Sequence, residues 1–140
     1  MGFLTLIFAH LFAVVHTLLP ECFFSVNVSR GFISSFGTEY YYDCTLIITA
    51  PSNHTVKLEF TIFQLSNDPL VPNADSFGQA KIQVHDGKRK SDPILGIFTG
   101  TRQPFTIQTS GRFMIVALQK DLIITPCNFK GTFYTTPKKG

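Results

Sequence analysis

Hydrophobic and polar residues alternate with a period of two along several stretches of this chain, which is the spacing of half-buried β-strands. The clearest stretch is Thr55–Leu65, in which the alternating apolar residues are Val56, Leu58, Phe60 and Ile62. The pattern predicts one strand with an apolar face and a polar face, up to the point where a second apolar residue follows Ile62.

The stretch Ala80–Gly100 is predicted to form a strand, a polar loop and a second strand. Ile82 and Val84 alternate with polar residues. Asp86-Gly87 then forms a turn dipeptide, because glycine tolerates positive φ and aspartate can hydrogen-bond its own turn. A basic tip, a proline and the apolar run Ile94–Phe98 complete the unit, and we expect neighbouring strands to pack against it.

Shorter apolar runs continue this pattern through the rest of the chain. Arg112–Leu118 is apolar on both faces, which predicts a central strand under cover. Roughly eight to ten short strands separated by turn residues, with no helical period, predict an all-β fold, a β-sandwich or jelly roll. The other predicted strands are Cys22–Val26, a fragment around Ile33 in Ser29–Ser35, Cys44–Ala50 and Pro104–Gln108, with Asp121–Thr125 and Lys130–Thr136 closing the domain.

Composition agrees with this fold class and excludes others. Hydrophobic residues make up 44% of the chain and charged residues 15%, so the chain is not intrinsically disordered. Fifteen phenylalanines and many β-branched residues favour strands over helices. The net charge of +3 is too small to indicate a nucleic-acid partner.

The N-terminal stretch is almost uninterrupted apolar sequence. Gly2–Leu19 contains no charged residue and is followed by Pro20, with no basic flank to stop transfer. We predict a signal peptide over residues 1–19, cleaved near 17–21, which leaves a secreted protein without a membrane span. The alternative is an uncleaved anchor.

Two tripeptides fit the acceptor pattern for N-glycosylation. They begin at Asn27 and Asn53, and each is expected in a loop. Two such sites behind a signal sequence support an extracellular location. The longest predicted loop, Ser66–Gln79, carries Asn67, Asp68, Asn73 and Asp75 among two prolines, and it is either functional or a solvated connection.

In order and spacing, these pieces resemble a CUB domain. The matching segments begin at Cys22 and end at Tyr134, so we assign a CUB-like domain to residues 20–136 and a polar tail to 137–140. The resemblance implies two packed antiparallel sheets and a non-catalytic extracellular role in binding proteins or glycans. The segments are GFISS at 31–35, TLIITAP at 45–51, VKLEFTIFQL at 56–65, IQVHDG at 82–87, LGIFTG at 95–100, FMIVALQKD at 113–121 and GTFY at 131–134.

The family usually has two disulfides, and this chain has cysteines for one. The resemblance implies the pair Cys22–Cys44 and leaves Cys127 without its own partner. Thr99 occupies the place of one cysteine of the second pair. Cys127 is then either a half-buried free thiol or, in an oxidising compartment, the site of disulfide exchange or of a covalent dimer.

Many members of the family bind calcium through three acidic positions, which here are Ser66, Ala80 and Asp121. Calcium needs several oxygen ligands with negative charge. We therefore predict that this chain does not bind partners through calcium, and that Asp121 is a turn residue. No other cofactor or metal site is predicted.

No catalytic constellation is recognisable. His85 stands beside Asp86, but no serine lies in a nucleophile motif, and we expect His85 on the polar face at a strand end. Zinc-ligand spacing and a phosphate-binding loop are absent from the sequence. We predict that the protein is not an enzyme.

Two functional hypotheses follow. In the first, a recognition module binds an extracellular protein or glycan through loops and one sheet face. The candidate contacts are the loop Ser66–Gln79 and the tyrosines Tyr40, Tyr41 and Tyr42, since tyrosine suits interfaces. In the second, a polyanion such as a heparin-like glycan binds a basic cluster. A third possibility is that the chain is a short form or fragment of a larger CUB-containing receptor or protease. The basic cluster would comprise Lys88, Arg89 and Lys90 together with Lys81, Arg102, Lys138 and Lys139.

Overall fold

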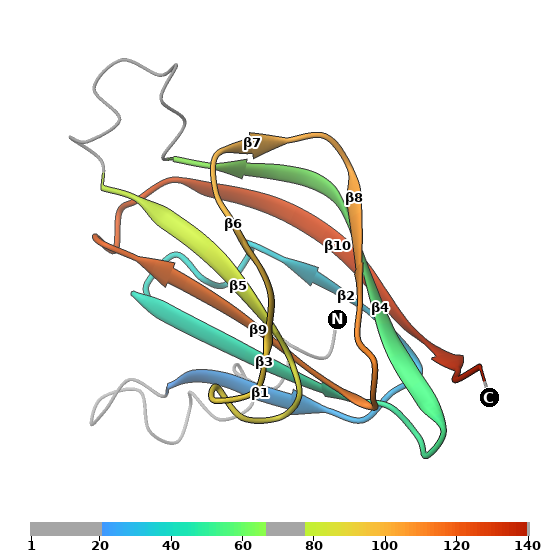
Figure 1. The fold of residues 1–140 in the computed structure, drawn as a ribbon. Coiled ribbons are helices and arrows are strands. Elements are labelled where there is room, and N and C mark those ends of the chain that lie inside the picture. Colours follow the sequence, from blue (N-terminus) through green and yellow to red (C-terminus); the bar gives the residue numbers. More distant parts are fainter. Residues whose placement is uncertain (1–20, 67–77, 140) are drawn as a thin grey trace.

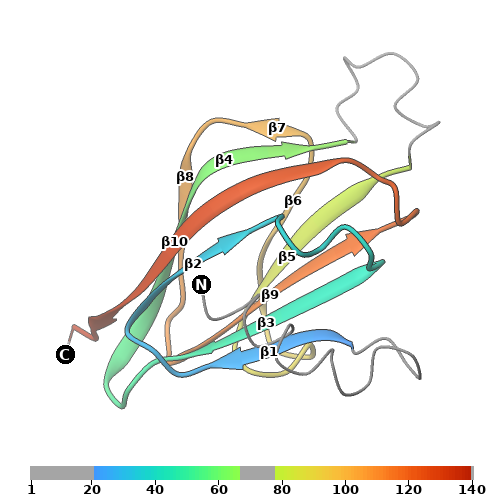
Figure 2. The same ribbon diagram turned by 180° about the vertical axis from the view of Figure 1, so that it is seen from behind.

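The computed structural model describes residues 21–66 and 78–139, and the predicted signal peptide and most of the predicted long loop lie outside these residues. The described chain forms ten strands in two sheets that pack face to face, and it contains no helix (Figures 1 and 2). The predicted all-β sandwich is therefore confirmed. No described segment is a helix long and apolar enough to cross a bilayer.

The first sheet has the order β1-β3-β9-β5-β6. Its edge pair, β1 and β3, is parallel, because the chain crosses to the other sheet to form β2 between them. All other pairs in both sheets are antiparallel, so the prediction of two antiparallel sheets is correct except at this edge. The strands are β1 (Cys22–Val26), β3 (Asp43–Thr49), β9 (Phe113–Lys120), β5 (Ala80–Asp86) and β6 (Ile94–Phe98).

The second sheet has the order β2-β10-β4-β7, and β8 pairs with another part of β4. The two-residue strand β7 was not predicted. The strands are β2 (Arg30–Ser34), β10 (Cys127–Pro137), β4 (His54–Leu65), β7 (Thr101–Arg102) and β8 (Phe105–Gln108).

The core lies between the sheets. As predicted, β9 is central in its sheet and buried on both faces, with Met114 and Ile115 on opposite faces at 0% and 2% exposure. Phenylalanines from the second sheet fill the other half of the core. Phe60 is fully buried and its ring centroid lies 5.1 Å from that of Phe63 and 6.2 Å from that of Phe129.

The predicted alternation of buried and exposed residues in β4 holds as far as Phe60 and fails at Ile62. Val56, Leu58 and Phe60 face the core, but Ile62 is 38% exposed and Phe63 is buried. The cause is a register irregularity: Phe60 pairs with Gly131 and Ile62 with Lys130, so Thr61 is an additional residue in β4. A bulge of this kind turns the following side chains to the opposite face.

His85 lies on the same face of β5 as Gln83, as predicted, but it is buried there and not exposed. A register shift between Val84 and His85 interrupts the pairing of β5 with β6. The loop after β5 folds back over the imidazole, whose Nδ1 donates to the Asp92 carbonyl oxygen (3.1 Å) and whose Nε2 accepts from the Gln83 amide (3.0 Å). Hydrogen bonds on both sides of the ring make its burial possible.

Candidate recognition surfaces

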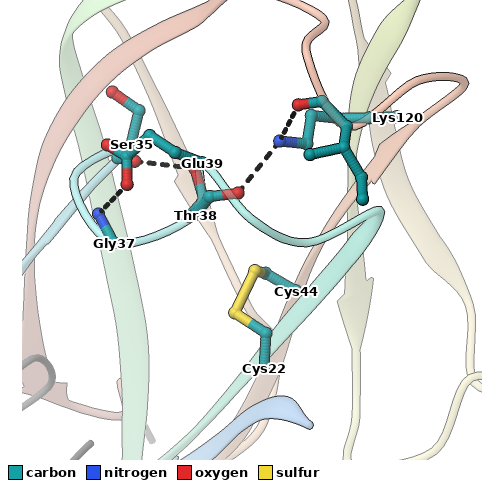
Figure 3. Close-up of a disulfide and its surroundings, with 8 residues drawn as sticks. Cys22, Ser35, Gly37, Thr38, Glu39, Cys44 and Lys120 are labelled. Carbon is teal, nitrogen blue, oxygen red and sulfur yellow. Dashed lines mark hydrogen bonds between the residues drawn. A yellow bond between two sulfur atoms is a disulfide. The ribbon is translucent and has the colours of Figure 1, made fainter. Parts of the chain in front are cut away.

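The disulfide joins the first two strands of the first sheet. Cys22 and Cys44 are register partners on β1 and β3, their Cα atoms are 4.6 Å apart, and their sulfur atoms are bonded. The pairing implied by the family resemblance is therefore confirmed. The disulfide lies directly below the connection between β2 and β3, which holds the predicted tyrosines (Figure 3).

That connection, residues 35–42, is a compact loop held by its own hydrogen bonds. The Thr38 amide and hydroxyl both donate to the Ser35 carbonyl oxygen, at 3.1 and 2.6 Å. Gly37 has φ 94°, a conformation that glycine adopts without strain, and its amide donates to Glu39 Oε1 at 2.9 Å. The conformation of this loop is therefore fixed by its own hydrogen bonds.

The three tyrosines do not act as one group. Tyr40 is 75% exposed and Tyr42 is 51% exposed. Tyr41 is half-buried and packs against the core. Two of the three predicted contact residues are therefore on the surface, and the middle one contributes to the fold.

Lys120 anchors this loop from inside the sandwich. It is the last residue of β9, and its Nζ donates to the carbonyl oxygens of Thr38 (2.9 Å) and Ile123 (3.0 Å), as Figure 3 shows for Thr38. Burial lowers the pKa of Lys120, and nearby Glu39 acts in the opposite direction. One buried ammonium thus joins the loop 35–42 to the turn after β9. Sequence reasoning did not identify this residue.

The turn after β9 covers residues 121–126, so the strand predicted over Asp121–Thr125 is wrong. The Leu122 amide donates to Thr125 Oγ1 (3.1 Å), and the Thr125 amide donates to the Leu122 carbonyl oxygen (3.0 Å). This turn and the loop 35–42 line an open pocket of about 400 Å³ that contains Glu39, Lys120 and Ile124. We define the tyrosine-loop surface as the exposed large side chains of these two segments: Phe36 (60%), Tyr40 (75%), Tyr42 (51%), Leu122 (41%) and Ile124 (71%).

Cys127 lines the same pocket as the first residue of β10. It is half-buried and has a free thiol, which lies 3.7 Å from the Thr125 carbonyl oxygen. Burial raises its pKa to about 11, against the opposing effect of Lys120. Its predicted role in an intermolecular disulfide stays a prediction.

The three positions that the family resemblance matches to calcium ligands are engaged in local structure. Asp121 Oδ2 accepts from the Gln79 amide (3.2 Å), which agrees with its predicted turn role. Ser66 Oγ donates to the Gly78 carbonyl oxygen (3.0 Å), and Ala80 is buried. Within residues 21–66 and 78–139 there is no group of three or more His, Cys, Asp or Glu side chains suited to a metal ion. Asn67, Asp68, Asn73 and Asp75 lie outside the described residues.

The predicted basic cluster is divided by the fold. Lys88, Arg89 and Lys90 are exposed in the loop between β5 and β6. Lys81 pairs with Gln119 at the far end of β5, roughly 16 Å along an extended chain from Asp86. Arg102 lies on β7, with its guanidinium 5.2 Å from the ring centroid of Phe98. Lys81 and Arg102 are therefore not part of the cluster.

Both glycosylation sequons lie at the end of the sandwich that carries this basic loop. Asn27 follows β1, and Asn53 is in the turn between β3 and β4 with φ 61°. Both asparagines are exposed. Glycosylation stays a prediction, and this placement leaves the tyrosine-loop surface clear of both sites.

The described architecture is that of a small disulfide-bonded β-sandwich with two distinct loop ends. Comparison with known proteins gives the family: the chain belongs to the CUB domain family, whose model matches residues 22–133. The resemblance noted in the sequence is thereby confirmed.

Curated relatives and solved structures agree. The chain is 24% identical to human neuropilin-2 over 127 residues, which cover 88% of this chain and 14% of that protein. It is 28% identical to human cubilin over 121 residues, covering 81% of this chain and 3% of cubilin. The chain thus spans a small part of each relative.

Among solved structures, the human MASP-1/3 CUB1-EGF-CUB2 structure superposes with a TM-score of 0.60 and 22% identity, over 83% of this chain and 43% of that chain. The Ca²⁺-bound CUB2 domain of MASP-1 gives 0.58 and 20%, over 79% and 96%. The extracellular region of zebrafish Gpr126/Adgrg6 gives 0.62 and 21%, over 84% and 15%. These likenesses show the fold.

Proposed function

We propose that this CUB module is secreted and binds an extracellular protein through the tyrosine-loop surface, without catalysing a reaction. The observation that carries the proposal is the exposure of Phe36, Tyr40, Tyr42, Leu122 and Ile124 on two loops that are joined by Lys120. Aromatic and aliphatic side chains on a preorganised surface bind partners at low entropic cost. One structural neighbour is part of an extracellular region, which supports the location.

Calcium has no part in the proposed binding. The proposal is supported by Asp121, whose carboxylate already accepts a backbone hydrogen bond, and by Ser66 and Ala80 at the other two positions. A divalent cation would have one carboxylate from this set, and calcium sites need more negative charge. Addition of EDTA is expected to leave partner binding unchanged.

The decisive experiment uses the secreted, affinity-tagged protein and two surface variants. Tyr40→Ser/Ile124→Ser removes the two most exposed side chains of the tyrosine-loop surface, and Phe32→Ser removes an exposed phenylalanine on β2 as a matched control. Partners are captured by cross-linking on cell surfaces and quantified by mass spectrometry. Partners retained by Phe32→Ser and lost by the double variant support the proposal. Equal capture by all three proteins contradicts it.

The alternative function is binding of an anionic glycan, and a specific observation favours it: three consecutive exposed cations in the β5–β6 loop. The chain also spans a small part of its curated relatives, so membership in a longer receptor or protease is compatible with either function. Immunoblotting of the endogenous protein with an antibody against the domain would distinguish a free module from part of a longer chain.

A further inference from the structure

The β5–β6 loop, residues 87–93, presents its cations from a fixed backbone. The Asp86 amide donates to the Pro93 carbonyl oxygen (2.8 Å), and the Asp92 amide donates to the Arg89 carbonyl oxygen (2.9 Å). The loop packs tightly at Gly87, where an added Cβ would collide with the Asp92 carboxylate. A ligand can bind the charges of such a loop without the entropic cost of ordering the chain.

The carboxylates beside these cations are used within the protein. Asp92 Oδ2 accepts from the Arg89 amide (3.0 Å), and its Oδ1 lies 3.7 Å from the Arg89 guanidinium, which remains exposed. Asp86 accepts from the Ser110 amide (3.0 Å) and hydroxyl (2.7 Å). Both acidic groups thus stabilise the loops, and the ammonium groups of Lys88 and Lys90 have no ion pair among the described residues.

A second basic residue group continues this surface across the sheet. Phe113, the first residue of β9, has Lys88 Nζ 5.2 Å and Arg112 Cζ 5.3 Å from its ring centroid. One ring therefore lies close to cations from two separate segments. Neither Arg112 nor Phe113 belongs to the cluster that was predicted from the sequence.

The surface extends toward the C-terminus through the β3–β4 turn. Arg112 Nε donates to the Ala50 carbonyl oxygen (2.9 Å), and the Lys138 amide donates to the Asn53 carbonyl oxygen (2.6 Å). These bonds bring Lys138 to the same end of the sandwich. We define the basic surface as Lys88, Arg89, Lys90, Arg112, Phe113 and Lys138.

We infer that the basic surface is a binding site for a sulfated polysaccharide, separate from the tyrosine-loop surface. The site gives the anionic-glycan alternative a location and does not depend on the protein-binding proposal. The two surfaces lie at opposite ends of β5 and β9, since Ala80 pairs with Lys120 and Asp86 pairs with Met114. In Figure 1 these strands run from one end of the sandwich to the other.

Charge distribution favours this class of ligand. Five cationic side chains lie on three segments at one end of the sandwich, an arrangement that suits a long ligand with several anions. Sulfate groups stay charged at every physiological pH, and guanidinium groups bind oxyanions through paired N–H donors. The aromatic residue of the surface, Phe113, is half-buried and already contacts two cations. The surface therefore favours a polyanion over an apolar peptide.

The test measures retention of the full secreted chain on immobilised heparin as a function of salt. The test variant is Lys88→Gln/Arg89→Gln/Lys90→Gln. The matched control is Arg30→Gln/Lys81→Gln/Lys130→Gln, which removes the same charge from positions outside the basic surface. A conservative variant, Lys88→Arg/Lys90→Arg, keeps the charge. Circular dichroism confirms that all four proteins are folded.

We expect the wild type, the control and the conservative variant to stay bound at physiological salt and the test variant to elute. The slope of log affinity against log salt should fall in magnitude by about one for each cation removed that contacts an anion of the polymer. Arg112→Gln should weaken retention in the same direction. Equal loss by the control, or elution of the wild type below physiological salt, would overturn the inference.

Competitors identify the ligand class. Soluble heparin should release the protein, whereas chemically desulfated heparin, polyglutamate and vesicles that contain phosphatidylserine should not at the same charge concentration. Release by polyglutamate or by vesicles at the heparin concentration would show general attraction to anions and would contradict a sulfated-polysaccharide site. Enzymatic removal of N-glycans from the wild type should leave retention intact; complete loss of retention after removal would assign it to those glycans.

Discussion

Alkylation of the Cys127 thiol should show an unusual dependence on pH. Cys127 is the free cysteine of the described chain, and it lines the pocket beneath the tyrosine-loop surface. Burial raises its pKa from 9.0 to about 11, because the thiolate loses solvation at this site. The nearby Lys120 ammonium acts in the opposite direction but is the smaller effect.

The magnitude follows from the fraction of thiolate, the form that reacts. At pH 8 a thiol of pKa 9.0 is about 10% ionised, whereas one of pKa about 11 is about 0.1% ionised. A thiolate of higher pKa is also intrinsically more nucleophilic, which raises the reaction rate roughly tenfold and so offsets part of the hundredfold loss of thiolate. Cys127 should thus react about tenfold more slowly at pH 8 than the same residue in the unfolded chain, before any steric protection.

The assay compares rates at two pH values, which removes steric effects and nucleophilicity from the comparison. Between pH 8 and pH 10 the iodoacetamide rate of the native protein should rise about 90-fold, against about tenfold for the chain unfolded in guanidinium with its disulfide intact. Intact-mass spectrometry after quenching gives each rate, and Cys127→Ser provides the blank. A native rate that levels off before pH 10 would refute the reasoning.

The same reasoning bears on the predicted covalent dimer. Disulfide exchange proceeds through the thiolate, so a protonated Cys127 exchanges slowly at extracellular pH. The dimer is therefore expected to form over hours and to require partial opening of the turn 121–126. Non-reducing electrophoresis of freshly secreted protein should show monomer.

Three further predictions concern stability, each measured by urea unfolding followed by circular dichroism. Phe60→Ala should cost about 3–5 kcal/mol, because its fully buried ring packs against Phe63 and Phe129; Phe32→Ala, at an exposed position, should cost less than about 0.5 kcal/mol, and equal effects would contradict the assigned core. Removal of the disulfide by Cys22→Ala/Cys44→Ala should cost about 3 kcal/mol for a link across 22 positions; an unchanged midpoint would mean that the unfolded chain is restricted by other contacts. Thr109→Val should cost about 1–3 kcal/mol because the buried Val56 amide loses its acceptor at 2.9 Å, whereas Thr109→Ser keeps the hydroxyl and should behave like the wild type.

Strand positions were predictable because alternation reports burial directly. In β4 and β5 the residues Val56, Leu58, Ile82 and Val84 face the core as their spacing requires. The both-sided apolar run in β9 correctly predicted a central strand, since a strand covered on both faces has no polar row. The family resemblance supplied the disulfide, which alternation does not indicate.

The parts of the site that were missed depend on register. Ile62 changes faces at an irregularity in the pairing of β4 with β10, which no periodic pattern contains. His85 keeps its face but is covered by the loop between β5 and β6, which hydrogen-bonds its ring through Asp92. In the sequence Lys120 is a cation at the end of an apolar strand, and its role requires the carbonyl groups of the distant loop 35–42 and of the turn directly after β9. Arg112 and Phe113 join the basic surface because their strand begins beside the β5–β6 loop. A signal for Lys120 was present: it occupies an inward position of β9.

The missing second disulfide has a noncovalent counterpart in this chain. Thr99, which the family resemblance matches to one of its cysteines, follows Phe98, whose ring centroid lies 4.8 Å from that of Phe105. Phe105 in turn packs 5.3 Å from Phe63, and the Arg102 guanidinium lies over both Phe98 and Phe105.

Each ring pair contributes about 0.5–1.5 kcal/mol beyond its buried area, and each exposed cation–π contact about 0.5–1 kcal/mol. Together they are comparable with the roughly 2–4 kcal/mol of a disulfide. The two kinds of link differ in how they act, because a disulfide restricts the unfolded chain whereas ring contacts exist in the folded state. A reducing agent should therefore loosen β1 from β3 and leave the corner between β6 and β8 intact. The disulfide and the aromatic contacts lie at opposite edges of the first sheet, so the edge formed by β1 and β3, beside the loop 35–42, is the redox-sensitive edge of the module.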